Sequence, residues 1–278
     1  MKFSIKKIGT YIYRLLKNIR YKLLDSIDLL LGKSNPLIPP RTMIFIGDGD
    51  YKKVGDEFLL YFKNLGGLKP NDKVLDIGCG IGRMALPLTG YLSDSGAYYG
   101  FDIVKKGIDW CRENITPRFQ NFHFEHSNIY NKMYNPEGSQ QSGEFRFNFK
   151  DESFDFVFLT SVFTHMYLSD VDHYLSEISR VLKPGGKCLI TFFLINELSQ
   201  KLINNGNSSQ ELIFQLDENS FIKDEKTPEV AIGFNEVQII KVFDTYCLKI
   251  IMPIHYGSWC GREEYLSYQD IVIAEKTS

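Results

Sequence analysis

The sequence lacks the cysteine pairs that hold small secreted or zinc-binding domains together. Its five cysteines are odd in number, far apart and without any CxxC pair, so we expect reduced cytosolic thiols. Histidine is also scarce. The closest group, His123, Glu125 and His126, falls on both faces of a predicted strand, which favours a structural pair over a ligand set. We therefore predict no bound metal.

Long apolar runs and an excess of charge are also missing. No apolar segment has the length that spans a bilayer, and the N-terminus lacks the apolar core and cleavage site of a signal peptide. A formal net charge of -2 over 278 residues gives no overall attraction to nucleic acid. We expect a cytoplasmic protein whose 44% hydrophobic content supports one substantial core.

Residues 1–33 differ from the rest of the chain in charge. Seven basic residues precede the first acidic one, Asp25, and apolar residues recur at spacings of three and four. This pattern predicts a basic amphipathic helix, which the linker NPLIPP at residues 35–40 follows. The helix is compatible with peripheral contact with an anionic membrane and, equally, with packing on the protein body or on a second subunit. The oligomeric state stays open.

Strands alternate with helices from residue 73 onward, which predicts a parallel sheet with right-handed crossovers in a domain spanning residues 41–278. Ahead of the sheet we expect a flexible loop at 46–55 and a helix at 55–67. The predicted strands are 73–78, 97–102, 122–127, 154–159 and 187–193, and the predicted helices between them are 82–92, 104–114 and 169–182. Ser169 and Asp172 have the spacing of a capping box for the last helix.

Two insertions interrupt this alternation, at residues 131–150 and 195–230. Segments of this length are usually lids, binding surfaces or disorder, and the first one contains a candidate hairpin. A helix near 234–243 and two antiparallel strands, within 247–256 and 268–275, close the chain.

The stretch VLDIGCGIGR at residues 74–83 carries the strongest functional signal. Gly78, Gly80 and Gly82 follow a predicted strand, so the backbone can turn sharply and approach a ligand with no side chain between. Dinucleotide folds space these glycines GxGxxG, whereas the spacing here is GxGxG. Asp76 would lie where a dinucleotide has its pyrophosphate, and a carboxylate there suits a cofactor with an ammonium group. The cofactor that this favours is S-adenosylmethionine.

Polar side chains also end the next two strands. Asp102 is placed to accept hydrogen bonds from both ribose hydroxyls of a nucleoside, although a solvated loop aspartate is the alternative. After the third strand, Ser127 or Asn128 is a candidate partner for the adenine edge, with Ile129 packed on the adenine face. Residues of this kind at a strand end are also common turn formers.

In this order and spacing, VLDIGCGIGR, GFDIV, HSNIY, FDFVFLTSVFTHM and RVLKPGGKCLI resemble the motifs of the class I S-adenosylmethionine-dependent methyltransferases. The resemblance covers about residues 55–195. It implies a Rossmann-like α/β fold with a doubly wound, seven-stranded sheet, mostly parallel with its last strand antiparallel. It also implies that cofactor and substrate lie at the carboxyl ends of the strands.

The resemblance implies a role for each motif residue. Asp76 and the glycine loop, including Cys79, would face the methionine part of the cofactor, and Asp102 and Ile103 would face its ribose. Ser127, Asn128 and Ile129 would face the adenine. Thr160 would contact the cofactor from the side across from these residues. Asn128 is a departure, because many relatives carry aspartate there. Its side-chain carbonyl can still accept a hydrogen bond from the adenine amino group.

The implied reaction is in-line methyl transfer, in which the protein aligns the acceptor, excludes water and, for a hydroxyl acceptor, removes a proton. His165, just beyond the fourth strand, is the predicted catalytic base. The alternative is a histidine that only hydrogen-bonds the following turn. His255, Tyr256 and Trp259 either line the acceptor site or belong to the core.

The segment after the fourth strand, LTSVFTHM, narrows the choice of acceptor. Enzymes that methylate exocyclic base nitrogens carry an Asp/Asn-Pro-Pro-aromatic sequence here, and enzymes that methylate the cytosine ring carry a Pro-Cys nucleophile. The segment has neither sequence, so no nucleic acid partner is expected. We favour an oxygen atom of a sugar, glycan or lipid-linked small molecule, with residues 1–33 bringing the site to a membrane. A carbon or nitrogen atom of another metabolite is the second choice. A nicotinamide oxidoreductase and a catalytically silent S-adenosylmethionine-binding partner protein are the competing classes.

Overall fold

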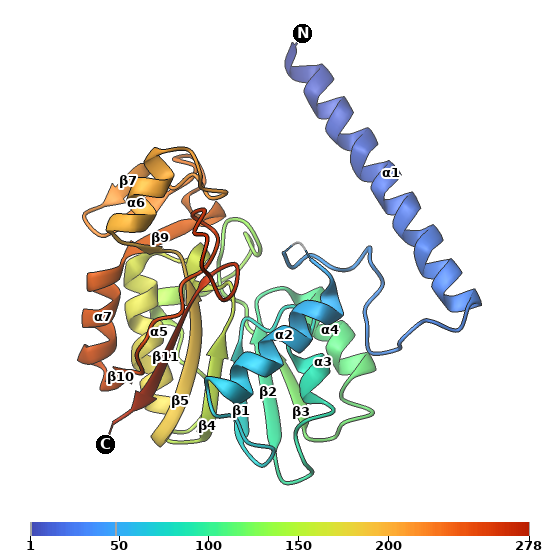
Figure 1. Cartoon of the computed structure of the whole chain (residues 1–278). Coiled ribbons are helices and arrows are strands. Elements are labelled where there is room, and N and C mark those ends of the chain that lie inside the picture. Colours follow the sequence, from blue (N-terminus) through green and yellow to red (C-terminus); the bar gives the residue numbers. More distant parts are fainter. Residues whose placement is uncertain (1, 48, 278) are drawn as a thin grey trace.

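The computed structural model describes residues 2–47 and 49–277, and within the first helix it describes side chains from residue 15 onward. A seven-stranded sheet forms the centre, in the order β10-β11-β5-β4-β1-β2-β3 (Figure 1). Its strands are β1 (Lys73–Ile77), β2 (Ala97–Asp102), β3 (Phe122–His126), β4 (Phe154–Leu159), β5 (Leu182–Phe192), β10 (Leu248–Ile250) and β11 (Asp270–Lys276).

The sheet has the predicted topology. β1 pairs in parallel with β2 and with β4, whereas β11 lies antiparallel between β5 and β10. Helices cover both faces: α2 (Tyr51–Asn64), α3 (Ala85–Leu88) and α4 (Lys105–Asn114) on one, α5 (Leu168–Val181) and α7 (Glu236–Thr245) on the other (Figure 1). Successive residues of β1, such as Val74 and Leu75, therefore pack into different cores. The expectation of a doubly wound sheet with an antiparallel last strand is confirmed.

Two predicted helices have different bounds in the structure. α2 begins at Tyr51 and not at residue 55, because the Asp50 carboxylate accepts a hydrogen bond from the Lys53 backbone N–H and caps the helix. The prediction of a flexible loop over all of 46–55 is therefore wrong for its second half. The helix predicted at 82–92 is only the single turn α3, with Pro87 inside it and Gly90 shortly after its end.

Two boundaries around α5 also differ from the prediction. α5 begins at Leu168, and its N-cap residue, Tyr167, makes no side-chain capping bond, so the predicted capping box is wrong. Asp172 instead accepts a hydrogen bond from the Tyr246 hydroxyl, at 2.7 Å. The predicted strand at 187–193 starts earlier, because β5 begins at Leu182, includes the segment KPGG and pairs with β4 through an irregular register.

The second insertion folds into a small sheet beyond the carboxyl end of β5 (Figure 1). Its strand order is β6-β9-β8-β7, and it carries its own apolar cluster around Leu212 and Trp259. The elements are β6 (Leu194–Ile195), α6 (Glu197–Asn204), β7 (Phe214–Asp217), β8 (Ser220–Ile222), the 3-10 turn η3 (Pro228–Val230) and β9 (Ile232–Asn235).

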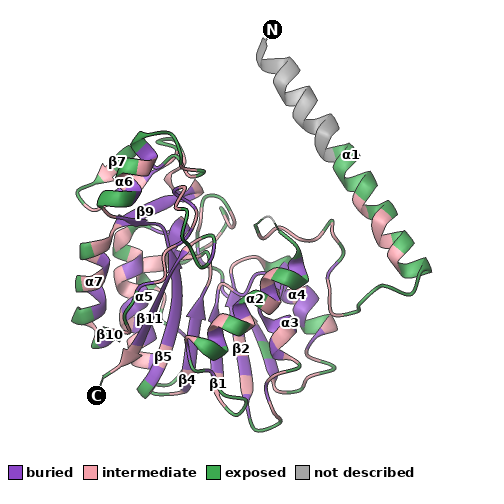
Figure 2. Ribbon diagram, in the orientation of Figure 1, coloured by how far each residue is buried: buried purple, intermediate pink, exposed green. Residues whose placement is uncertain are grey.

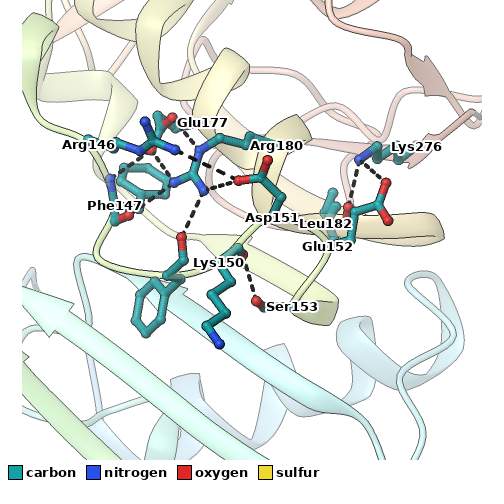
Figure 3. A network of polar contacts seen from close by, with 11 residues as sticks. Arg146, Phe147, Lys150, Asp151, Glu152, Ser153, Glu177, Arg180, Leu182 and Lys276 are labelled. Atoms are coloured by element: carbon teal, nitrogen blue, oxygen red, sulfur yellow. Dashed lines mark hydrogen bonds and ion pairs between the residues drawn. The ribbon is translucent and has the colours of Figure 1, made fainter.

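The first insertion contains isolated bridges rather than the candidate hairpin of paired strands. Asn131 bridges Asn135, Ile129 bridges Gln140, and the 3-10 turn η1 (Ser142–Glu144) follows. One side chain of α5 holds the end of this segment (Figure 3). Arg180 binds the carboxylates of Glu177 and Asp151 and the backbone carbonyls of Phe147 and Phe149.

Replacing Arg180 by alanine is expected to destabilise the protein by about 2–4 kcal/mol, because it leaves the buried Glu177 carboxylate and two carbonyls without their cation. Chemical denaturation measures this loss. Lys105→Ala, which breaks the exposed pair with Asp109, is the control and should change stability by less than about 0.5 kcal/mol. Equal effects of the two substitutions would contradict the role given to Arg180.

The first helix, α1 (Lys2–Leu30), stands apart from the sheet and its covering helices (Figures 1 and 2). Its apolar stripe is exposed along the described side chains, among them Leu15, Ile19 and Leu23. Arg41, directly after the linker, binds the carboxylates of Asp25 and Asp28, at 2.5 and 2.7 Å. No helix among residues 2–47 and 49–277 combines the length and the apolar character needed to cross a membrane.

Candidate active site

A cavity of about 760 Å³ lies at the carboxyl ends of β1, β2 and β4. Its lining comes from the glycine loop after β1, from the segment before α2, and from both insertions. The carboxyl ends of parallel strands are where open α/β sheets bind ligands. Both insertions therefore form part of the cavity wall. Of the three roles predicted for them, namely lids, binding surfaces or disorder, this agrees with binding surfaces.

The glycine loop has a backbone that only glycine adopts without strain. Gly78, Gly80 and Gly82 have φ angles of +79°, +59° and +81°. A Cβ atom on Gly78 would lie 2.3 Å from Cγ2 of Val162, beyond β4, so a side chain there would collide with the cavity wall. Gly78, Cys79 and Gly80 line the cavity; Gly82 turns the chain behind it, against Cys111 and Ile115.

Asp76, near the carboxyl end of β1, lines the cavity and is fully buried. The Tyr98 hydroxyl donates a hydrogen bond to its Oδ2 at 2.7 Å, whereas Oδ1 has no partner among the described residues. Burial raises the pKa of Asp76 to about 8, because the charged form has lost its water. A buried carboxyl with a free oxygen can take a hydrogen-bonded cation.

Arg83 lies at the same loop and lacks a fixed partner. Its Nε atom is buried and has no hydrogen-bond acceptor among the described residues. The Arg83 side chain also belongs to none of the ion pairs found among these residues. Burial lowers its pKa, although a guanidinium keeps its charge at any ordinary pH. Sequence reasoning missed this residue, because a basic side chain at a helix start gives no functional signal without the fold. Its position directly after Gly82 in the glycine motif was the available signal.

Asp102, at the end of β2, is buried and holds the glycine loop. Its two carboxylate oxygens accept hydrogen bonds from the backbone N–H groups of Gly80 and Val104, each at 2.7 Å. A carboxylate has about four acceptor positions, so about two remain for a ligand. Ile103 and Asp102 both line the cavity. Burial raises the Asp102 pKa, and its backbone hydrogen bonds act in the opposite direction.

The predicted adenine partners lie in different places. Ile129 is buried and lines the cavity, but Ser127 and Asn128 do not line it. The Asn128 side chain is exposed and bonds Ser139 and Asn135 within the first insertion. Neighbouring side chains of that insertion, Tyr130, Asn131 and Tyr134, line the cavity together with Thr160.

His165 lies beyond the end of β4 and contacts residues of both insertions. It lies in the 3-10 turn η2 (Phe163–His165) and lines the cavity. Its Nδ1 is 2.7 Å from the Glu229 carbonyl oxygen in the second insertion, and the Tyr134 ring of the first packs edge-on at 5.5 Å. A carbonyl only accepts, so Nδ1 carries the proton and neutral His165 has its lone pair on Nε2. Burial lowers its pKa and favours that neutral form.

The aromatic residues of the last hairpin contact the core and the small sheet. The Trp259 Nε1–H donates to Asp270 at 2.7 Å, and the Tyr256 hydroxyl donates to Glu236 at 3.0 Å. Neither these two nor His255 lines the cavity. Ser267, Tyr268 and Gln269, which immediately precede β11, line it instead.

The comparison with protein families decides what kind of domain this is. Residues 75–190 match the family described as a methyltransferase domain. These residues are a class I S-adenosylmethionine-dependent methyltransferase domain. The match begins in β1 and ends in β5, so it includes the glycine loop, Asp102 and His165. The resemblance noted in the sequence is confirmed.

Named relatives match part of this chain over part of their own length. Phosphoethanolamine N-methyltransferase 2 of Caenorhabditis elegans is 31% identical over 149 residues, which is 54% of this chain and 29% of the relative. Demethylmenaquinone methyltransferase of Lactobacillus johnsonii is 33% identical over 127 residues, 46% of each. The chain thus spans less than half the length of these relatives.

A solved structure shares the fold over nearly the whole chain. Magnesium protoporphyrin IX methyltransferase from Synechocystis PCC 6803, with bound SAH, has a TM-score of 0.52 and 15% identity. The similarity covers 94% of this chain and all of the Synechocystis chain. At this identity the likeness concerns the fold alone.

Proposed function

We propose that the protein transfers a methyl group from S-adenosylmethionine to an oxygen atom of an uncharged, hydroxyl-bearing small molecule, such as a sugar, a glycan or a lipid-linked compound. The observation that carries the proposal is that one cavity combines the Asp76 carboxyl and the Arg83 guanidinium at the glycine loop with the oriented ring of His165. When bound, the cofactor supplies an electrophilic methyl group.

The residues at the glycine loop fit the amino-acid end of this cofactor. Among the described residues, neither Asp76 Oδ1 nor the Arg83 guanidinium has a fixed partner, and both lie beside the same loop. One would hold the α-ammonium group and the other the α-carboxylate, and a nicotinamide dinucleotide has no counterpart for that pair. Asp102 would hold the ribose and Ile129 would pack on the adenine. The SAH bound to the Synechocystis enzyme is consistent with this choice of cofactor.

Cofactor binding is expected to release a proton from Asp76. In the free protein the Asp76 pKa is about 8, so the carboxyl is protonated at neutral pH, and an ammonium group beside it favours the charged form. Near pH 6.5 we expect about one proton released per S-adenosylhomocysteine bound. Calorimetry in phosphate and in Tris measures this as a difference in apparent binding enthalpy. Asp76→Asn should abolish the difference. A wild-type enthalpy that does not depend on the buffer would contradict the expected release.

The sign of this linkage also predicts how stability depends on pH. The folded pKa of Asp76 lies above its unfolded value, so its contribution to stability is complete below pH 4 and is lost as the pH rises through 8. The cation of the cofactor offsets this loss. The rise in melting temperature caused by S-adenosylhomocysteine should therefore be larger at pH 8 than at pH 6.

The other half of the cavity suits an uncharged polar acceptor. Hydroxyl and amide groups of Ser161, Ser209, Gln210, Tyr268 and Gln269 line it, together with the ring of Phe193. Among the described residues, Arg83 at the glycine loop is the one lysine or arginine that lines the cavity. A phosphate or carboxylate group of an acceptor would therefore lose its water without a cation to replace it, which is costly.

His165 is the residue that we propose takes the acceptor proton. Its Nδ1–H is held by the Glu229 carbonyl, so the ring is oriented and Nε2 is the basic atom. The Glu229 carbonyl belongs to the second insertion, so this insertion orients His165 in addition to lining the cavity. Removing water from around the acceptor is the second task of both insertions.

A methyl-transfer screen tests the proposed function. The full-length protein is incubated with cofactor labelled in its methyl group and with cell extract separated into lipid, glycan and small-metabolite fractions. We expect label in neutral hydroxyl compounds, as an ether that withstands mild base. Label on nitrogen or carbon, or in phosphate-bearing compounds, would contradict the proposed acceptor. No transfer despite bound S-adenosylhomocysteine would indicate a silent partner protein.

We further propose that α1 brings this site to an anionic membrane. The described part of the helix exposes Lys17, Arg20 and Lys22 beside its apolar stripe, and its two acidic residues are paired with Arg41. A basic helix with an unpaired apolar face binds at the interface of anionic lipid. This supports a lipid-linked or membrane-proximal acceptor.

Reversing the three α1 charges, as Lys17→Glu, Arg20→Glu and Lys22→Glu together, is expected to weaken binding to vesicles that contain phosphatidylserine. At about 1 kcal/mol for each basic residue, the loss is on the order of a hundredfold in co-sedimentation. The matched control reverses three exposed lysines of the body, Lys105, Lys201 and Lys241, for the same change in net charge. Equal vesicle binding by the two triple variants would contradict a role of α1 at membranes.

A further inference from the structure

Three polar side chains from three strand ends meet at the acceptor half of the cavity. Ser161 follows β4, Thr191 lies in β5, and Gln269 precedes β11. Oε1 of Gln269 accepts hydrogen bonds from the hydroxyls of Thr191, at 2.6 Å, and Ser161, at 3.0 Å. Both Ser161 and Gln269 line the cavity, whereas Thr191 is completely buried behind them.

The Thr191 hydroxyl fixes which way the Gln269 amide points. Its oxygen already accepts a hydrogen bond from the Ser161 backbone N–H, at 2.8 Å, so its single proton must be donated elsewhere. With the amide as described, that proton goes to Gln269 Oε1. A flipped amide would leave the proton of a buried hydroxyl without an acceptor, which is unfavourable. The buried Thr191 thus selects the orientation with Oε1 toward the sheet.

The Nε2 group of Gln269 is therefore the end that remains for a ligand. None of the described residues accepts a hydrogen bond from it, and it is not one of the buried polar atoms that lack a partner. Its two N–H groups are donors only. Whatever binds beside them must offer an oxygen or another acceptor, and a group that itself carries only N–H protons, such as an ammonium, is disfavoured.

The backbone at Ser161 is consistent with a site that holds a fixed geometry. Ser161 has a φ of +58°, which is uncommon for a residue with a Cβ. Its backbone N–H is bound by Thr191 and its hydroxyl by Gln269, so both ends of the strained residue are tied to this cluster. Strain of this kind collects at functional sites and is kept only where surrounding bonds impose it.

We propose that Gln269 determines acceptor specificity: its Nε2 donates a hydrogen bond to a neutral oxygen of the methyl acceptor, and Thr191 and Ser161 position it for this. The inference rests on the proposed function and narrows it. It selects acceptors with a hydroxyl, ether or carbonyl oxygen near the methylated atom and rejects protonated amines. Thr191 acts only through Gln269 and is a positioning residue.

The test uses the full-length protein saturated with S-adenosylhomocysteine and a panel of neutral probes, namely phenyl β-D-glucopyranoside, catechol and benzyl alcohol. Benzylammonium is the cationic counterpart. The side-chain amide signal of Gln269 is observed by ¹⁵N NMR and assigned by its loss in Gln269→Leu. At least one neutral probe should shift that signal, and benzylammonium should not.

Binding constants supply the second measurement. Gln269→Leu and Gln269→Glu should each weaken the neutral probe about tenfold, the effect of one lost hydrogen bond of about 1.4 kcal/mol. The affinity for S-adenosylhomocysteine should not change. Gln269→Glu, which presents an acceptor in place of a donor, should bind benzylammonium more tightly than the wild type does. Thr191→Val should weaken the neutral probe by a smaller factor, because it releases the amide to flip.

Wild-type affinity of the neutral probe in both Gln269 variants would overturn the proposal. So would the absence of any Gln269 shift with all three neutral probes, or equal binding of benzylammonium and a neutral probe by the wild type. Failure of S-adenosylhomocysteine to bind would instead contradict the proposed function. The two failures are therefore distinguishable. Thermal denaturation of each variant shows whether a change in probe binding comes from lost folding.

Discussion

Arg83→Met is expected to weaken S-adenosylhomocysteine binding about a hundredfold, because it removes two charge-assisted hydrogen bonds to the ligand carboxylate worth about 3 kcal/mol together. The guanidinium lines the cavity beside the glycine loop and has no fixed partner in the part of the chain that the structure describes. An unpaired buried cation gains more from an incoming carboxylate than an exposed one, since its lost hydration is replaced. Binding calorimetry measures the effect.

A truncated ligand separates this role from a general disturbance of the site. 5′-Methylthioadenosine keeps the nucleoside and sulfur but lacks the amino-acid end, so Arg83→Met should bind it with wild-type affinity. Arg118→Met, on the surface of the domain, is the matched control and should leave both ligands unaffected. Equal losses for the two ligands would mean that Arg83 supports the loop and does not hold the carboxylate.

His165→Ala is expected to lower turnover about a hundredfold or more with an oxygen acceptor, while the affinity for S-adenosylhomocysteine changes little. The ring is oriented by the Glu229 carbonyl and is neutral, which are the two properties that a general base needs. His165→Gln keeps a polar side chain of similar size but takes up no proton, so it should be nearly as slow. His123→Ala, at an exposed position on β3, is the control and should retain wild-type turnover.

The pH profile provides an independent test of the same residue. Burial lowers the pKa of His165 from its ordinary value near 6.5, so the base stays neutral into mildly acidic solution. Turnover of the wild type should fall only below pH 6.5, and this acid limb should vanish in His165→Gln. Unchanged turnover in His165→Ala would remove the residue from the mechanism and leave it a structural partner of the second insertion.

The sheet was predictable from the sequence because short stretches of neighbouring residues determine where its strands and turns form. Mostly apolar five- and six-residue segments such as FDFVFL form strands that are buried on both faces, and each is followed by a polar turn or a helix. GxGxG directly after the first strand predicts where the chain must turn, and the positive φ angles of all three glycines bear this out. The positions of Asp76, Asp102 and His165 at one edge then follow from parallel pairing alone.

The cavity wall was not predictable, because its residues come from segments whose contacts are distant in the sequence. The orientation of His165 depends on a carbonyl 64 residues away, and that of Gln269 on Thr191, 78 residues away. The surroundings of Asn128 were not predictable either. Its motif position beside adenine stays a prediction, and in the structure its side chain bonds Ser139 and Asn135 of the first insertion. Side-chain bonds within a loop compete with a ligand, and no spacing rule predicts which one prevails.

The most direct test of the central claim is calorimetric titration of the full-length protein with S-adenosylhomocysteine and, separately, with NAD. Among the described residues, the glycine loop has beside it a buried carboxyl with one unbonded oxygen and a guanidinium without a fixed partner, which match an amino acid and not a pyrophosphate. We predict saturable binding of one S-adenosylhomocysteine per chain and no measurable binding of NAD. Tight binding of NAD, with none of S-adenosylhomocysteine, would contradict the account.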